Sequence, residues 1–205
     1  MHKFEESSIK QFDWWAKNYR LFTFWFDPLN KKIAQEINPK KEASILDVGC
    51  GWGLLLKQLS LLDRNLKLFG IDISPEMVKV AKNNFLENLE IEIKEGSADK
   101  LPYKDNTFDY VTCILSFHHH PNSLRSLQEM NRVLKPGGQL ILLDAFKENI
   151  IQKIFLKYNE FIFNEKDTQH YSKAGMKELF EKAGFKNIMQ KTPRFYHLLS
   201  IGNKK

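Results

Sequence analysis

The sequence predicts an open α/β fold, in which strands of a mostly parallel sheet alternate with helices. The first observation is the stretch from Ser44 to Leu59, where an apolar run ends in an acid, glycine takes every second position, and helical apolar spacing follows. The second is that further apolar runs alternate with helical segments as far as Asp144. Parallel strands need such crossover helices, so this alternation indicates a parallel sheet that binds ligands at its carboxyl edge.

Length and composition agree with one domain over residues 1–205. The chain has 42% hydrophobic and 27% charged residues, and none of its apolar runs approaches the ~20 residues of a membrane span. The N-terminal residues do not follow a signal-peptide pattern, and the two cysteines do not make a disulfide framework. We therefore expect a cytoplasmic protein without a membrane span.

The net charge of +6 comes mainly from the C-terminal third. Residues 147–205 hold 12 Lys+Arg against 6 Asp+Glu, whereas residues 45–146 hold 11 against 13. The basic residues are spread along the chain, which favours a solvated surface over a nucleic-acid or anionic-membrane patch. Nucleic acid is therefore not the expected partner, and peripheral membrane contact stays open.

The glycine turn indicates the kind of ligand. Gly49, Gly51 and Gly53 do not fit the dinucleotide pattern G-x-G-x-x-G, and no Gly-Lys-Ser/Thr phosphate cradle follows them. Asp47, just before the turn, would repel a diphosphate but suits an ammonium or a sulfonium. The turn therefore favours a cationic or zwitterionic nucleoside over NAD.

The second strand, residues 66–72, ends in Asp72 about 20 residues beyond the turn. A carboxylate there accepts hydrogen bonds from the vicinal hydroxyls of a ribose. Ser74-Pro75-Glu76 then predicts a helix start, with an N-cap, a proline at the first helical position and an acid in the first turn. Asp72 is therefore the second candidate ligand-binding acid.

The remaining elements follow from the same signals. Asp27-Pro28 predicts a helix start, and the pair Gly137-Gly138 predicts a helix end. A turn and a buried fourth strand are predicted over residues 105–115. The other predicted strands are 89–94 near the sheet edge, 139–144, 186–192 and 195–201, and the predicted helices are 124–134, 150–163 and 172–183.

Four motifs in register carry a family resemblance. They are Asp47-Val48-Gly49-Cys50-Gly51-Trp52-Gly53, Asp72-Ile73-Ser74-Pro75-Glu76-Met77, the stretch from Leu101-Pro102 to Phe108-Asp109, and Arg132-Val133-Leu134-Lys135-Pro136-Gly137-Gly138. Over about residues 40–146 the chain resembles the class I S-adenosylmethionine-dependent methyltransferases that act on small molecules, and it is similar to those of ubiquinone and menaquinone biosynthesis. The resemblance implies a Rossmann-like sheet of seven mostly parallel strands, with helices on both faces and the last strand antiparallel.

The resemblance also implies S-adenosyl-L-methionine as cofactor, with S-adenosyl-L-homocysteine as product. Asp99 then corresponds to the acid that binds the amino group of the adenine, and Met77 flanks that ring or, equally, packs in a helix core. The full implied cofactor set is Tyr19, Asp47, Gly49, Cys50, Gly51, Gly53, Asp72, Ile73, Met77, Ser97, Ala98, Asp99 and Leu115.

The fourth predicted strand ends at three successive histidines, where the resemblance places the methyl acceptor. A general base is needed only if the acceptor loses a proton, and His118, His119 and Tyr19 are the candidates. The histidine run alone does not predict a metal site, because three successive side chains cannot point one way. A further ligand from His170 or His197 is left open.

Two segments are expected to form lids, an N-terminal helical lid over 1–40 and an insertion over 147–171. Aromatic residues crowd positions 12–26 and 155–163, which favours a small apolar or aromatic acceptor that can carry negative charge. The competing interpretation is that these aromatic rings only fill the core of the lids.

The sequence thus predicts methyl transfer from S-adenosylmethionine to a small molecule. The nucleic-acid alternative, including a tRNA methyltransferase, lacks the [DN]-P-P-[YF] motif and a Pro-Cys loop. A cofactor-binding subunit that has lost catalysis remains the other alternative, because intact acids show binding but not turnover. The oligomeric state is not predicted.

Overall fold

The computed structural model describes residues 12–13, 16, 19–84, 91–162 and 168–205. In chain order its elements are α2 (Tyr19–Ile37), β1 (Ser44–Val48), α3 (Leu54–Leu62), β2 (Lys67–Asp72), α4 (Pro75–Asn84), β3 (Ile91–Glu95), β4 (Phe108–Ile114), the 3-10 turn η1 (Phe117–His119), α5 (Ser123–Val133), β5 (Leu134–Ala145), α6 (Ile150–Ile162), α7 (Lys173–Lys182), β6 (Phe185–Arg194) and β7 (His197–Lys204).

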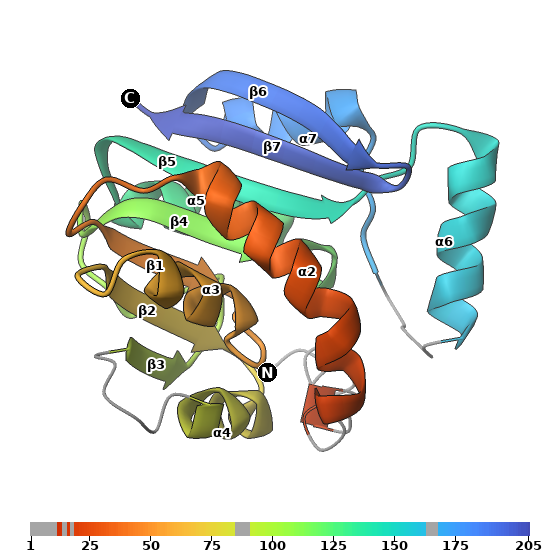
Figure 1. Ribbon diagram of the computed structural model, residues 1–205. Helices are drawn as coiled ribbons and strands as arrows, with labels where there is room; N and C mark the ends of the chain where they lie inside the picture. The colour runs from red at the N-terminus through yellow and green to blue at the C-terminus, as the bar shows by residue number, and fades with distance from the viewer. Residues whose placement is uncertain (1–11, 14–15, 17–18, 85–90, 163–167) are drawn as a thin grey trace.

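The described strands form one seven-stranded sheet in the order β3-β2-β1-β4-β5-β7-β6 (Figure 1). Neighbouring strands from β3 to β5 are parallel, whereas β7 is antiparallel to both β5 and β6. The mostly parallel sheet and its antiparallel last strand are therefore confirmed, as is the edge position of β3. The strand order reverses between β1 and β4, and ligands of such sheets bind at that switch point.

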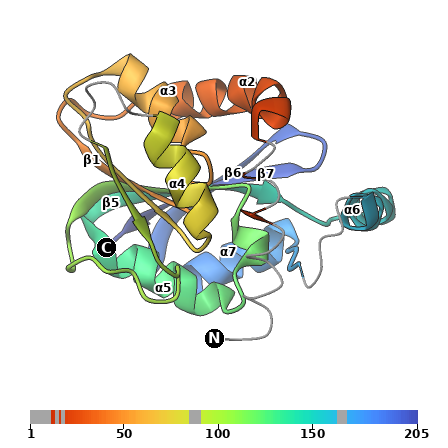
Figure 2. The same ribbon diagram turned by 90° about the horizontal axis from the view of Figure 1, so that it is seen from below.

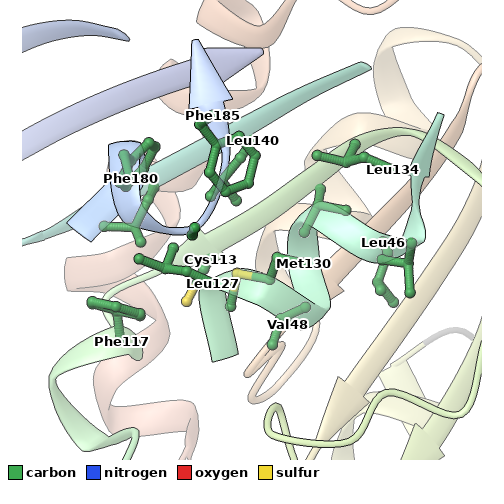
Figure 3. Close-up of a cluster of buried hydrophobic side chains, with 14 of the residues drawn as sticks. Leu46, Val48, Cys113, Phe117, Leu127, Met130, Leu134, Leu140, Phe180 and Phe185 are labelled. Carbon is green, nitrogen blue, oxygen red and sulfur yellow. The ribbon is translucent and has the colours of Figure 1, made fainter. Parts of the chain in front are cut away.

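Helices cover both faces of the sheet, with α2, α3 and α4 on one side and α5 and α7 on the other (Figure 2). Alternate strand residues serve the two cores, since successive side chains point to opposite faces. Leu46 and Leu140 pack toward α5 and α7, where Phe180 and Phe185 complete the cluster (Figure 3). Ile45, beside Leu46 in the chain, packs toward α2 and α3 instead.

The prediction that a helix begins at Asp27-Pro28 is wrong. Helix α2 runs from Tyr19 to Ile37 with Pro28 inside it. The Asp27 carboxylate does not cap a helix, because it accepts a hydrogen bond of 2.8 Å from Gln58 on α3. This bond ties the two helices together where they cover the sheet.

The prediction that Gly137 and Gly138 end a helix is also wrong. Helix α5 already ends at Val133, and β5 begins at Leu134 and runs through both glycines. A Cβ on Gly138 would lie 2.9 Å from the carbonyl oxygen of Asp109 on β4. The glycines therefore allow close strand pairing at an irregular point in the β4–β5 ladder.

Candidate active site

A cavity of about 620 Å³ opens at the carboxyl ends of β1, β2, β4 and β5. Its walls come from the turn after β1, the loop after β3, the histidine run after β4, and α6 with the β6–β7 turn. Eleven of the thirteen residues implied for the cofactor line it, namely Asp47, Gly49, Cys50, Gly51, Asp72, Ile73, Met77, Ser97, Ala98, Asp99 and Leu115.

Each of the three glycines in the turn is required for a different structural reason. All three have positive φ angles, of 70° at Gly49, 51° at Gly51 and 74° at Gly53. A Cβ on Gly49 would lie 1.8 Å from the Ser116 hydroxyl oxygen, whereas a Cβ on Gly51 would meet nothing within 4 Å. Gly51 thus exposes backbone to the cavity, which leaves room for a ligand. Gly53 lies at the N-cap of α3 and does not line the cavity.

Asp72 joins the turn after β1 to the start of α4. Its Oδ2 accepts a hydrogen bond of 2.8 Å from the Gly51 amide, and its Oδ1 accepts one of 2.9 Å from the Ser74 amide. Burial raises the pKa of Asp72, and these amide bonds oppose the rise. Each carboxylate oxygen can accept a second hydrogen bond, so the side chain stays able to bind ribose hydroxyls.

Asp47 at the end of β1 is almost fully buried. Its Oδ1 accepts a hydrogen bond of 2.7 Å from the Thr112 hydroxyl. Burial, with a smaller contribution from Asp72, raises the pKa of Asp47 to about 7, although the Thr112 bond opposes the shift. A buried carboxylate of this kind gains most from a cationic neighbour in the cavity.

The loop after β3 places Asp99 in the wall of the cavity. Asp99 Oδ1 accepts a hydrogen bond of 2.6 Å from the Ser126 hydroxyl, and its backbone carbonyl accepts one from Arg125. Leu115, at the end of β4, has a positive φ of 53°, which few residues other than glycine adopt. Such backbone strain is often found beside ligand sites.

Cys50 lines the cavity, and its side chain is packed toward β2. Its sulfur lies against Gly70, where a Cβ would come within 2.9 Å of it. Burial raises the pKa of the Cys50 thiol, which keeps it unreactive. The side chain of Tyr19 lies outside the described residues, as do Trp14 and Trp15.

His118 forms an ion pair or hydrogen bond with Asp144 at the carboxyl end of β5. The distance from His118 Nδ1 to Asp144 Oδ1 is 2.7 Å, and the His118 amide donates to Asp144 Oδ2 at 2.8 Å. Burial opposes ionisation of Asp144, but His118 outweighs it and lowers the pKa of Asp144 to about 2. The carboxylate holds the proton on Nδ1, so a neutral ring carries its lone pair on Nε2.

Five of the six histidines of the chain line the same cavity, and the other four surround His118. Burial lowers the pKa of His120 and of His197 to about 4, and it also lowers those of His119 and His170. These four rings are therefore neutral at pH 7. No group of three or more metal-binding side chains is arranged to hold an ion among the residues described.

The sequence reasoning missed Asp144 and Trp52. Asp144 is an acid at the end of a parallel strand, the same signal that singled out Asp47 and Asp72. Trp52, inside the glycine turn, packs with Ala16 and Met77 and lies edge-on to Phe26 at 5.9 Å. Trp52 and Phe26 thus add aromatic surface to the cavity wall at the glycine turn.

The fold and the site together define an α/β protein with a cavity at the switch point of its sheet, lined by four acids and a histidine cluster. A family model described as "Methyltransferase domain" matches residues 46–142. A demethylmenaquinone methyltransferase of Staphylococcus saprophyticus is 33% identical, covering 77% of this chain and 76% of the relative. One of Bacillus licheniformis is 35% identical, with coverage of 77% and 76%. The chain belongs to the family of S-adenosylmethionine-dependent methyltransferases.

Solved structures agree on the fold. A methyltransferase from Haloferax volcanii, in complex with the activator Trm112, aligns with a TM-score of 0.78 and 22% identity over 94% of this chain and 96% of that one. A possible histamine N-methyltransferase from Thermotoga maritima aligns with a TM-score of 0.76 and 21% identity over 96% and 99%. Within the described part of this chain, none of the helices has the length and apolar character needed to cross a membrane.

Proposed function

We propose that this methyltransferase transfers the methyl group of S-adenosylmethionine to a small apolar, aromatic acceptor that loses a proton. The observation that carries the proposal is the pairing of His118 with Asp144 in the cavity wall, at the carboxyl ends of β4 and β5. The proposal separates a cofactor side, with the acids of β1, β2 and the loop after β3, from an acceptor side around His118.

The cofactor side fits S-adenosylmethionine by charge and by shape. Gly51 leaves open space for the ligand, Asp47 favours a cation, and Asp72 retains acceptor capacity for hydroxyl groups. The cofactor supplies an electrophilic methyl group on a sulfonium. The chain contributes by holding donor and acceptor in line, which accounts for a large part of such a rate enhancement. We assign Asp99, with its Ser126 partner, to the adenine side.

The acceptor side fits a flat apolar molecule with an acidic proton. Leu156 and Tyr196 supply apolar wall, and the four neutral histidines add polar atoms without charge. His118 Nε2 accepts the acceptor's proton, and Asp144 stabilises the resulting imidazolium. The curated relatives are named demethylmenaquinone methyltransferases, so a demethylmenaquinol-like hydroquinone is the acceptor that we propose.

The test is S-adenosylhomocysteine release by the purified chain with reduced demethylmenaquinone, against a reaction without acceptor. We expect acceptor-dependent release that drops by about 10²-fold or more in His118→Gln, since general-base catalysis contributes at least that factor. Calorimetric binding of S-adenosylhomocysteine should be unchanged in this variant. Glu178→Gln on the solvent face of α7 is the matched control, and its rate should equal that of wild type.

The same assay separates the non-catalytic alternative. A cofactor-binding subunit without turnover would bind S-adenosylhomocysteine but release none with any acceptor. Normal turnover in His118→Gln would instead leave the methyltransferase assignment standing and refute the role of His118 as general base. The mostly apolar cavity favours a small acceptor over a nucleic acid.

A further inference from the structure

Helix α6 turns apolar side chains toward solvent, whereas a core helix turns them toward the sheet. Five residues are each between 61% and 82% exposed, namely Ile150, Ile151, Ile154, Tyr158 and Phe161. At the 3.6-residue period of a helix they fall within an arc of about 100°, and we call them the α6 stripe. Figures 1 and 2 both show α6 standing apart from the helices that cover the sheet.

The opposite side of α6 is fixed to the molecule. Gln152 is buried and donates a hydrogen bond of 2.6 Å to the Phe195 carbonyl in the β6–β7 turn, and Phe155 packs on Tyr196 with ring centroids 4.8 Å apart. Toward its C-terminal end, Glu160 accepts a hydrogen bond of 2.6 Å from Thr168. These contacts hold the stripe outward.

Charge borders the stripe on one side. Lys153 and Lys157 are exposed and lie next to it on the helix, and the exposed Arg194 ends β6 just before the β6–β7 turn. The one acid of α6, Glu160, is turned inward to Thr168 and His170. An amphipathic helix with large apolar side chains and basic neighbours is the pattern that lies in the interface of an anionic bilayer.

The stripe is also continuous with the cavity. Leu156 and Asn159, on the inner side of α6, line the cavity together with Arg194 and Tyr196. We propose that the α6 stripe docks on an anionic lipid bilayer and so brings the cavity mouth to the lipid surface. This inference rests on the proposed function, because it supplies an entry route for an apolar acceptor. A second copy of the chain fits less well, since a two-fold contact would bring equal positive charges together.

The test is co-sedimentation of the full chain with vesicles of phosphatidylcholine, with and without phosphatidylglycerol. We expect binding to the anionic vesicles that weakens with added salt. The variant Ile154→Asp with Phe161→Asp should bind about tenfold or more weakly, because two large apolar side chains no longer enter the interface. The matched control is Leu61→Asp with Leu62→Asp, which adds the same charge to an exposed apolar pair on α3.

Three outcomes would overturn docking. They are a wild-type chain that does not bind anionic vesicles, equal loss of binding in both double variants, and a wild-type dimer that the α6 variant alone dissociates. S-adenosylhomocysteine binding, measured on every variant, reports an intact fold and cofactor site. If S-adenosylhomocysteine binding persists while vesicle binding is absent, only the docking proposal fails. If the wild-type chain does not bind S-adenosylhomocysteine, the proposed function fails whatever the vesicle experiment shows.

Discussion

Asp47 at the end of β1 and Asp72 at the end of β2 line the same cavity, yet the chain stabilises their charges differently. Asp72 has backbone amides on both oxygens, whereas Asp47 has a single hydroxyl partner, Thr112. Hydrogen bonds to a carboxylate favour its charged form, and burial disfavours it. Asp47 is therefore the group whose charge depends most on what occupies the cavity.

We predict that S-adenosylmethionine binds more weakly as the pH falls below 7. With a pKa of about 7, the Asp47 carboxyl is increasingly protonated below that pH, and a cationic ligand favours the ionised form. The affinity should fall by up to about tenfold per pH unit, with proton release on binding. Calorimetry in buffers of different ionisation enthalpy measures both quantities. Asp47→Asn should bind weakly with no such pH dependence, and an unchanged pH profile in this variant would rule Asp47 out.

At the scale of elements, the turn after β1 packs closely against the segment that follows β4, with Gly49 next to Ser116. We predict that Gly49→Ala destabilises the fold by about 2–5 kcal/mol, from left-handed backbone strain and from overpacking against Ser116. Gly51→Ala carries only the strain, since its Cβ would enter open space, and should cost about 1–2 kcal/mol. Urea unfolding compares the two variants, and equal losses would show that the contact with Ser116 is unimportant.

Most elements were predictable because their signals are local. Ser74 caps α4 as expected, since its hydroxyl accepts a hydrogen bond from the Met77 amide at 3.1 Å. The two errors arose where a distant residue competes with the local signal. Asp27 bonds to Gln58 on another helix, and Gly138 faces the Asp109 carbonyl on a neighbouring strand. Neither Gln58 nor the Asp109 carbonyl can be predicted as a partner from the sequence next to Asp27 or Gly138.

The same distinction applies to the site. The acids at the strand ends and the glycine turn were predictable, because one parallel sheet places consecutive strand ends together. The pairing of His118 with Asp144 was not, since it depends on β4 and β5 being adjacent in register. The place of His170 could also not be predicted without the tertiary structure. This residue lies in the segment after α6, and its ring stacks on that of His118 with centroids 5.5 Å apart.

At the scale of the whole molecule, the buried histidines make stability depend on pH. Burial keeps His197 neutral in the folded protein down to pH about 4, whereas the unfolded chain binds a proton below about 6.5. Unfolding therefore takes up a proton in this window, and stability is lost as the pH falls from 6.5 to 4. The contribution of His197 is about 2–3 kcal/mol.

We predict that His197→Gln loses less stability than wild type between pH 6.5 and 4. Free energies of unfolding from urea titrations at several pH values measure the difference in slope. The other cavity histidines and the raised pKa of Asp47 act in both proteins and so cancel in this comparison. Parallel pH profiles would show that His197 does not contribute to the acid sensitivity.

The cavity wall draws on segments that are far apart in the chain. The cavity-lining residues assigned to the cofactor lie between Asp47 and Leu115, whereas Leu156, Asn159, Arg194 and Tyr196 come from α6, the end of β6 and the β6–β7 turn. Helix α6 contacts the β6–β7 turn through Gln152 and Phe155, and Glu160 contacts Thr168 in the segment after the helix. Substitutions in α6 can therefore reshape the acceptor side of the cavity while the residues assigned to the cofactor keep their place.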